Sequence, residues 1–231
     1  MLLRLARGTG ELLMTLGVVI LLFVAYLLWW TDVVQHATQH HLLGQLQHQW
    51  TAPVGPGPAP SDPSFDYQHV ALGQGIAVLR IPRLGKAYEQ VVVQGTGVAD
   101  LQKGPGHITT TAAAGQQGNF TVSGHRVTYG RPFYDLAELR PGDTLVFETA
   151  DRWYTYVEDD QITVLPTDVW VTDAVPRGRT AGRLLTITTC TPRFSATHRL
   201  VLQGHLMDTD MTRAGFLPAA LRAVYGTAAS S

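Results

Sequence analysis

The sequence predicts a mainly β domain, closed or nearly closed as a barrel or a sandwich, with short helices on its loops and one transmembrane helix before it. One observation is an uncharged apolar run close to the N-terminus. The other is that, from about Phe65 onward, short stretches rich in Val, Ile, Thr, Tyr and Phe are separated by Gly, Pro and Asp. Such stretches are typical of strands, and their regular spacing is typical of all-β folds.

Length, charge and cysteine content exclude several classes of protein. The 231 residues are enough for one ordinary domain with accessory segments. With 17 basic and 18 acidic residues the net charge is -1, which argues against a nucleic-acid partner, because phosphate binding needs a basic excess. One Cys cannot form an intramolecular disulfide or a Cys-rich metal centre, and no acidic cluster indicates a calcium site. We therefore expect no metal and no cofactor, and a thiol that is either inert or reactive.

The apolar run predicts an uncleaved membrane anchor. It extends from Leu12 to Trp30 (LLMTLGVVILLFVAYLLWW), about 28 Å as a helix, against about 30 Å for the hydrocarbon core of a bilayer. Arg4 and Arg7 precede it and Asp32 follows it, so residues 1–11 are expected in the cytoplasm and everything after Trp30 outside. The alternative, a cleaved signal peptide, would have a shorter core ending in small residues. The expected location is the cell membrane, single-pass, with the β domain extracellular.

Residues 31–63 are expected to connect the anchor to the domain. Asp32 to Trp50 has the composition of a short helical stalk, and Ala52 to Pro63 (APVGPGPAPSDP) is an extended Pro/Gly-rich spacer. Histidines on a polar helix are usually solvated, so we assign no metal site to the stalk. Transition-metal binding stays open as the minor alternative because the stalk carries four of them, His36, His40, His41 and His48.

Residues 64–210 are expected to form the β domain, and residues 211–231 a C-terminal tail that frays. Two short helices are predicted between the strands, at Val98–Gly104 and Pro132–Leu139, where apolar residues recur at helical spacing. Strands are predicted in the segments IAVLRIPRLG, EQVVVQG, GNFTVSGH, DTLVFETADRWYTYVEDDQITVL, LLTITTC and RLVLQGHL.

Three residues are candidates for chemistry. Cys190 ends the strand LLTITTC and Arg199 opens the next strand, so both side chains are expected to reach one surface, where an Arg stabilises a thiolate or an oxyanion. His125 is the preferred partner because it ends the strand NFTVSGH and can face the end of the Cys190 strand. The alternatives are a buried inert Cys, an Arg in an ordinary ion pair and a His that hydrogen-bonds a turn.

The chain resembles the sortase family in several motifs. The likeness extends over about Gly75 to Leu206, and its GPGH and GHRVTYGRPF details are most similar to the class E sortases of actinobacteria. The motifs are TITTC at Thr186 to Cys190 followed by Pro192 and Arg199, GNFTVSGHR at Gly118 to Arg126, GPGH at Gly104 to His107, and the stretches YGRPFYDLAEL and LRPGDTLVF.

This resemblance implies a closed eight-stranded β-barrel of the sortase type and a membrane-anchored cysteine transpeptidase. Cys190 would be its nucleophile, His125 its general acid and base, and Arg199 the group that stabilises the oxyanion or orients the peptide. The implied substrates are surface proteins with a C-terminal sorting signal of the LAXTG or LPXTG kind, cleaved between Thr and Gly through a thioester. The implied acceptor is an amine of a cell-wall precursor similar to lipid II.

The resemblance also implies substrate-binding positions. Ile108 follows GPGH where class E members often have a Tyr associated with an LAXTG-type signal, so an altered preference and a neutral change are both open. Thr188, Thr189 and Tyr129 are expected near the substrate without an assigned chemical role. Two other functions remain as alternatives: a cysteine hydrolase of the cell wall, and a non-catalytic anchored β-domain that binds a surface partner.

Overall fold

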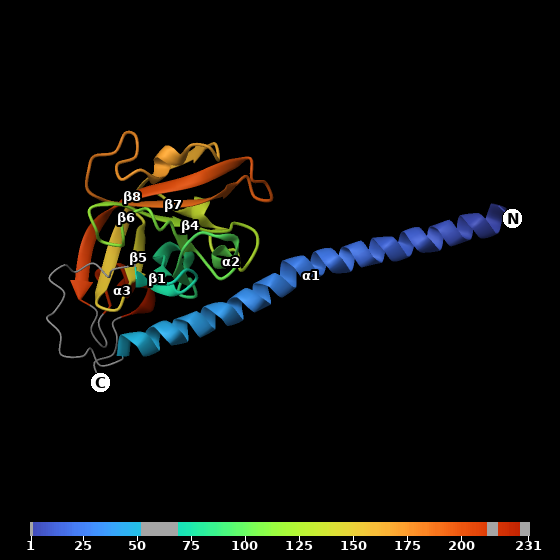
Figure 1. Cartoon of the computed structure of the whole chain (residues 1–231), viewed down its shortest axis with the longest axis horizontal. Coiled ribbons are helices and arrows are strands. Elements are labelled where there is room, and N and C mark those ends of the chain that lie inside the picture. The colour runs from blue at the N-terminus through green and yellow to red at the C-terminus, as the bar shows by residue number, and fades with distance from the viewer. Residues whose placement is uncertain (1, 52–68, 212–216, 227–231) are drawn as a thin grey trace.

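The computed structural model describes residues 2–51, 69–211 and 217–226. Eight strands of this part close into a barrel in the order β1-β2-β3-β4-β7-β8-β6-β5 (Figure 1), which confirms the predicted fold and selects the barrel over the sandwich. β2 and β3 are parallel, as are β4 and β7, and the other neighbours are antiparallel. The strands are β1 (Gly75–Arg80), β2 (Glu89–Gln94), β3 (Gly106–His107), β4 (Gly118–Ser123), β5 (Thr144–Glu148), β6 (Arg152–Val164), β7 (Arg183–Thr191) and β8 (His198–Met211).

The barrel interior is filled by side chains that alternate along the strands. On β7, Leu185 and Ile187 belong to the core and are at most 1% exposed, so the residues between them point outward. Phe147 forms T-shaped ring pairs with Phe120 and Tyr156 in this core, with centroids 5.0 and 5.7 Å apart. The core therefore determines on which face of β7 each side chain at the C-terminal end of the strand lies.

The helices on the loops are shorter than the sequence indicates. Within the predicted segment 132–139, Phe133, Leu136 and Leu139 are buried at every third position. That spacing suits a 3-10 turn, whose side chains repeat every three residues, better than an α-helix. The short helices are η2 (Pro82–Leu84), α2 (Val98–Leu101), η3 (Leu136–Glu138) and η4 (Val169–Thr172).

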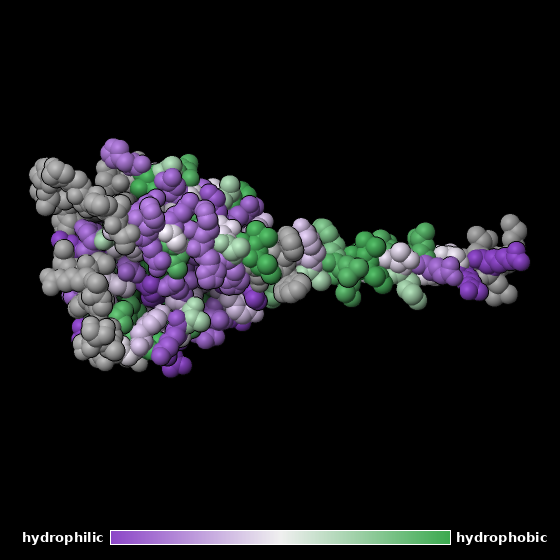
Figure 2. All heavy atoms as spheres, turned by 90° about the horizontal axis from the view of Figure 1, so that it is seen from below, coloured by the Kyte–Doolittle hydropathy of each residue, from purple (hydrophilic) through white to green (hydrophobic). Residues whose placement is uncertain are grey.

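The N-terminal helix α1 runs without a break from Leu2 to Thr51 and extends far beyond the barrel (Figure 1). Its segment Arg7–Tyr26 is long and apolar enough to cross a membrane and is not buried in the molecule. Figure 2 shows a band of hydrophobic side chains on the part of the helix that stands clear of the barrel. The helix is compatible with a single-pass anchor, and the predicted span over residues 12–30 overlaps this segment.

The second half of α1 packs on the barrel as an integral part of the domain. Leu42 and Leu46 are buried against Val78 of β1 and against Val91 and Val93 of β2. These valines point away from the barrel interior and would otherwise be exposed apolar surface, which explains why the helix stays docked here. We call residues 35–50 the docked half of α1; the predicted spacer at residues 52–63 lies outside the described residues.

Two buried glutamines fix the docked half of α1 to backbone groups of the barrel. Gln39 accepts from Val91 N at 2.6 Å and donates through Nε2 to Val91 O at 3.1 Å and to Lys103 O at 2.7 Å. Gln35, which is 1% exposed, also donates to Lys103 O at 3.3 Å. The amide side chain of Gln39 thus supplies donor and acceptor to a β2 residue as a neighbouring strand would.

A helix near the C-terminus also packs on the barrel. The sequence indicates a fraying tail over residues 211–231, but α3 (Ala219–Tyr225) buries Leu221 completely against Val146 and Trp153. The hydroxyl of Tyr225 donates to Lys86 O at 3.0 Å. This helix has only seven residues, so its apolar pattern is too short to be recognised in the sequence. Its packing partners lie on β5 and β6, so it can dock only on the folded barrel.

Candidate active site

Cys190 lies on the outer face of the barrel, directly opposite Arg199. The two residues are register partners in the antiparallel β7–β8 ladder, in which opposed Cβ atoms are about 4.5 to 5.5 Å apart. The adjacent pair, Thr189 and Leu200, is buried and points inward. Cys190 and Arg199 are both half-buried. A thiol and a guanidinium therefore share one partly accessible surface, as the strand-loop-strand pattern predicts.

The connection between β6 and β7 covers the outer face of β4 and β7 only up to Thr186. The Nδ2 of Asn119 and the hydroxyl of Thr186 donate to Val171 O, at 3.1 and 3.2 Å. Further along the same face of β7, Thr188 and Cys190 are half-buried. We call the surface from Thr188 to the end of β7 the open face; it contains the thiol.

His125 follows β4 at the level of Cys190. β4 and β7 run parallel with Ser123 opposite Thr188, and Gly124 N continues the ladder by donating to Thr188 O at 3.1 Å. His125 and Cys190 are each two residues further along. Because residues two apart along a strand share a face, continuing this register puts His125 at the level of Cys190.

The environment of His125 favours a neutral imidazole. Burial lowers the pKa of His125 below its ordinary value, so the ring is uncharged at pH 7. The ring of Tyr129 lies 5.0 Å from that of His125 between centroids. Tyr129 itself has a φ of 50°, a left-handed conformation that is uncommon for a residue with a side chain. A neutral imidazole can take a proton from a thiol and return it to an amine.

The guanidinium of Arg199 is held by its own loop. Its Nη1 donates to Ala196 O at 3.0 Å and to His198 O at 3.1 Å. These two bonds leave the other donors of the guanidinium for a ligand on the surface beside Cys190. A preorganised donor at this position can stabilise negative charge that develops on a carbonyl oxygen.

Arg126 is a residue of this site that the sequence analysis does not assign. Its Nη1 donates to the backbone oxygen of Cys190 at 3.2 Å and to the hydroxyl of Thr191 at 2.8 Å. It is 7% exposed, and burial, followed by the charge of Arg193, lowers the pKa of Arg126. Its place directly after His125 is the one sequence feature that could have drawn attention to it.

The two threonines predicted to bind substrate lie on opposite faces of β7. Thr188 shares the open face with Cys190. Thr189 points inward, is 2% exposed and donates its hydroxyl to Gly124 O at 2.8 Å. This bond joins the end of β4 to the end of β7, because Gly124 directly precedes His125 and Thr189 directly precedes Cys190.

Ile108 lies on the same side of the sheet but away from the thiol. Its N–H donates to Thr121 O at 2.9 Å, and Thr121 precedes His125 by about 13 Å along the strand. Ile108 is half-buried. Tyr129, in contrast, is at the level of His125, whose ring it contacts.

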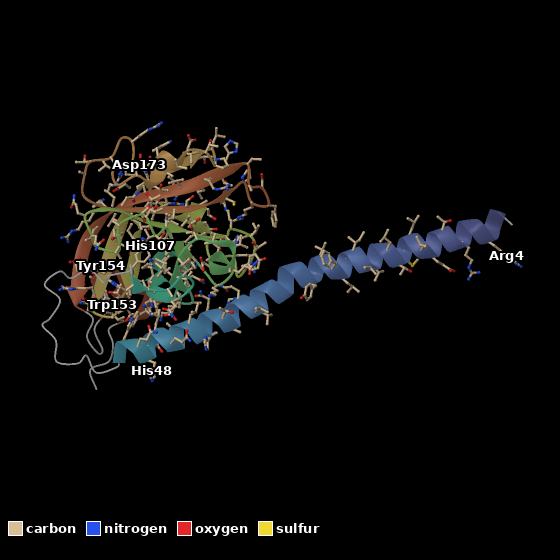
Figure 3. The ribbon with its side chains drawn as sticks, in the orientation of Figure 1. Arg4, His48, His107, Trp153, Tyr154 and Asp173 are labelled. Atoms are coloured by element: carbon tan, nitrogen blue, oxygen red, sulfur yellow. The ribbon has the colours of Figure 1, made fainter. Side chains whose placement is uncertain are left out.

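His107 of the GPGH motif faces the core of the barrel (Figure 3). Its ring is 5.3 Å from that of Phe120 between centroids, and its Nδ1 is 2.8 Å from Gln94 Oε1. Burial lowers the pKa of His107 to about 4, although hydrogen bonds to the backbone oppose this shift. His107 is therefore a neutral structural histidine at pH 7.

The described residues offer no metal centre. Within residues 2–51, 69–211 and 217–226, no group of three or more His, Cys, Asp or Glu side chains is placed to hold a metal ion. The stalk histidines His40, His41 and His48 line a hollow of about 460 Å³ between α1 and the start of β1. Neither Cys190 nor His125 lines this hollow.

Comparison with known proteins identifies relatives of the chain. A sortase domain family matches residues 79–207. Sortase SrtE1 of Streptomyces coelicolor is 36% identical over 217 residues, which cover 88% of this chain and 57% of the relative. Sortase SrtE2 of the same organism is 32% identical over 214 residues, which cover 87% of this chain and 81% of the relative. The chain thus spans a little over half the length of SrtE1.

Solved structures show the same barrel. Sortase E from Streptomyces avermitilis is 47% identical with a TM-score of 0.62, and the match covers 66% of this chain and 99% of that one. Sortase E1 from Streptomyces coelicolor, solved with a tripeptide in its active site, is 34% identical with a TM-score of 0.61, covering 64% and 97%. The matched family segment contains β4 and β7, and Cys190 lies on β7. The chain therefore belongs to the sortase family, and class E sortases of Streptomyces are among its relatives.

Proposed function

We propose that this chain is a membrane-anchored cysteine transpeptidase in which Cys190 is the nucleophile, His125 the general acid and base, and Arg199 the group that stabilises the oxyanion. The observation that carries the proposal is the register pair of Cys190 and Arg199. The β4–β7 register, which runs to Ser123 and Thr188, supports a place for His125 at the level of Cys190. Membership of the sortase family and the single Cys of the sequence support it.

The first half-reaction cleaves the sorting signal. His125 takes the proton of the Cys190 thiol, and the sulfur attacks the carbonyl carbon of the Thr in the signal. The oxygen becomes negative in the tetrahedral intermediate, where the Arg199 guanidinium stabilises it. The carbon–nitrogen bond to Gly then breaks, and the His125 imidazolium gives its proton to the departing amine. The product is a thioester between Cys190 and the Thr.

The second half-reaction transfers the acyl group. The amine of a cell-wall precursor attacks the thioester carbonyl and gives a proton to His125. Collapse of the intermediate breaks the carbon–sulfur bond, and the sulfur leaves as a thiol with the proton from His125. One amide bond is exchanged for another, so no oxidant, reductant or metal is required.

The open face suggests how the peptide lies. An extended four-residue segment spans about 13 Å, which matches the separation between Cys190 and the level of Ile108 along the strands. Thr188 lies between these positions on the same face, and Tyr129 adjoins His125. We infer that a signal of the LAXTG or LPXTG kind lies along the open face, between Cys190 and the level of Ile108. Its carriers would be surface proteins, the acceptor a lipid II-like amine, and the location the outer side of the cell membrane.

Mass spectrometry of the full chain in detergent tests this function. The chain is incubated with LAXTG and LPXTG peptides, and we expect an acyl adduct on Cys190 and none on Cys190→Ala. Cleavage by Cys190→Ala at the wild-type rate would overturn the mechanism. A Cys190 that forms no adduct and also resists a methanethiosulfonate reagent would favour a non-catalytic binding domain.

The acceptor is tested separately by adding an amine to the same reaction. A peptide–amine conjugate that replaces the free peptide acid is the expected product. If the free acid is formed at the same rate with and without the amine, and no conjugate appears, the protein is a cysteine hydrolase and the transpeptidase proposal is wrong.

A further inference from the structure

We propose that Arg126 is a positioning residue of the catalytic centre and the cation that balances the Cys190 thiolate. The inference rests on the proposed function, because it concerns how the nucleophile of that reaction is held. This role differs from the one proposed for Arg199, whose guanidinium is hydrogen-bonded to its own loop and shares the outer surface of β7 and β8 with the thiol.

Arg126 connects the two strand ends that carry the reacting groups. It follows His125 directly, so its backbone belongs to the turn that places the imidazole. Its side chain reaches across to the end of β7, where Nη1 donates to the backbone oxygen of Cys190 and to the hydroxyl of Thr191. A single side chain therefore holds the backbone of the nucleophile to the turn that contains the base.

Arg126 is a buried cation without a carboxylate partner. It is 7% exposed and, in the described part of the chain, it forms no ion pair; its buried Nε also has no hydrogen-bond partner there. Burying a charge in this way is costly unless an opposite charge compensates it. The two bonds from Nη1 are made to neutral acceptors and compensate the charge incompletely.

The charged and titratable groups near Arg126 are Arg193, Asp135, Cys190 and Tyr134, and Cys190 is the one to whose backbone Arg126 is hydrogen-bonded. Arg193 repels Arg126, and Asp135 is already paired with Arg193 at 3.0 Å. The Cys190 sulfur is negative when it reacts as a thiolate, and Arg126, hydrogen-bonded to the backbone of the same residue, supplies a positive charge close to it.

The hydrogen-bond geometry selects the variants that test this proposal. Both bonds start from one nitrogen, so a lysine ammonium, with three donors and a positive charge, can replace them. Glutamine keeps a donor without the charge, and methionine keeps the apolar stem alone. The readouts are the rate of Cys190 alkylation by iodoacetamide in the full-length chain in detergent, and kcat and KM for the sorting peptide. Cys190 is the single thiol of the chain, so alkylation reports on it alone.

We expect the charge to decide the ranking. Arg126→Gln and Arg126→Met should be alkylated about tenfold more slowly than wild type, equivalent to about 1.4 kcal/mol, whereas Arg126→Lys should stay within about threefold. Turnover should follow the same order through kcat, with KM changed by less than about twofold, because the substrate does not contact a buried guanidinium. Arg140→Met, which removes an exposed arginine, is the matched control and should behave as wild type.

Two results would overturn the proposal: Arg126→Gln alkylated as fast as wild type, or a folded Arg126→Lys as slow as Arg126→Met. If Arg126→Met does not unfold cooperatively on heating, it is not folded and is left out. The comparison of Arg126→Lys with Arg126→Gln then tests whether the charge sets the alkylation rate. A failure of the proposed function is distinguishable, because wild type would then form no acyl adduct with any peptide while the alkylation ranking remained measurable.

Discussion

Cys190 and Arg199 form a directly opposed pair on β7 and β8, on the outer face of a strand pair whose inner face is buried in the core. The hydrogen-bonded ladder between β7 and β8 sets the distance between Cys190 and Arg199, so this distance does not depend on the conformation of the loop at residues 192–197. His125 reaches the same place from β4, which is hydrogen-bonded to the other side of β7. β7 and β8 thus hold the thiol and the guanidinium, and the residues directly after β4 bring the imidazole to the same end of three adjacent strands.

The first prediction concerns the roles of these three side chains. With the preferred sorting peptide, Cys190→Ala should form no thioester. His125→Gln should lower kcat by about 10² to 10⁴, because proton transfer is lost. Arg199→Gln should lower kcat by about 10² to 10³, because the oxyanion loses a charged donor. Thermal unfolding should show that each variant is folded, and wild-type kcat in either His125→Gln or Arg199→Gln would contradict its assignment.

The second prediction concerns peptide preference at Ile108. Ile108→Tyr should raise kcat/KM for an LAXTG peptide relative to an LPXTG peptide by about tenfold or more, since one pocket contact is worth about 1 to 3 kcal/mol. Competition between the two peptides, quantified by mass spectrometry, measures the ratio. Thr110→Val, at an exposed position of the same loop, is the control. A ratio that is unchanged in Ile108→Tyr would make this loop position neutral.

The third prediction uses the opposite orientations of two adjacent threonines. Thr189→Val removes the buried bond to Gly124 O and should lower the free energy of unfolding by about 1 to 3 kcal/mol. Thr188→Val, on the open face, should change it by less than about 0.5 kcal/mol and act on KM for the peptide instead. Urea unfolding and peptide kinetics of both variants make the test. Equal stabilities would show that the Thr189 hydroxyl is not a structural donor.

The fourth prediction is a loss of stability in acid through His107. Its pKa is about 4 in the folded chain and about 6.5 in the unfolded chain, so the unfolded state binds the proton more readily. The contribution is complete above pH 6.5 and is lost as the pH falls toward 4, by about 3 kcal/mol in total. The lowered pKa of His125 acts in the same direction.

Urea unfolding between pH 7 and pH 4 measures this slope. His107→Gln should flatten it, whereas His198→Gln, at an exposed position, should keep the wild-type slope. An NMR titration of the His107 ring gives an independent check, and a midpoint near 6.5 in the folded chain would refute the prediction.

The fifth prediction concerns the docked half of α1. Gln39→Leu removes the hydrogen bonds from this side chain to Val91 N, Val91 O and Lys103 O and should lower the free energy of unfolding by about 2 to 3 kcal/mol. Gln45→Leu, at an exposed position of the same helix, should change it by less than about 0.5 kcal/mol. Urea unfolding in detergent compares them. If both variants match wild type, α1 is a tether that the barrel does not need.

Much of the site could be predicted because its pattern is local. Cys190 and Arg199 are joined by a short loop between two strands, so their approach follows from strand geometry alone. Among the histidines of the domain, His125 is favoured by its place at the end of a predicted strand, and its role is implied by the family resemblance. Arg126 was missed because its partners, the Cys190 oxygen and the Thr191 hydroxyl, lie on a strand distant in sequence.

The sequence by itself determined the mainly β class, the apolar N-terminal helix and the motifs of the sortase family. Each of these is a property of neighbouring residues: a period of two along a strand, a long uncharged run, or a short string of letters. The tertiary structure alone decided that Thr188 and Thr189 lie on opposite faces of β7, that α1 and α3 pack on the barrel, and that Arg126 donates to the backbone oxygen of Cys190. Those outcomes depend on the register between strands far apart in the chain, and a register is set by the packing of the whole core rather than by any local segment.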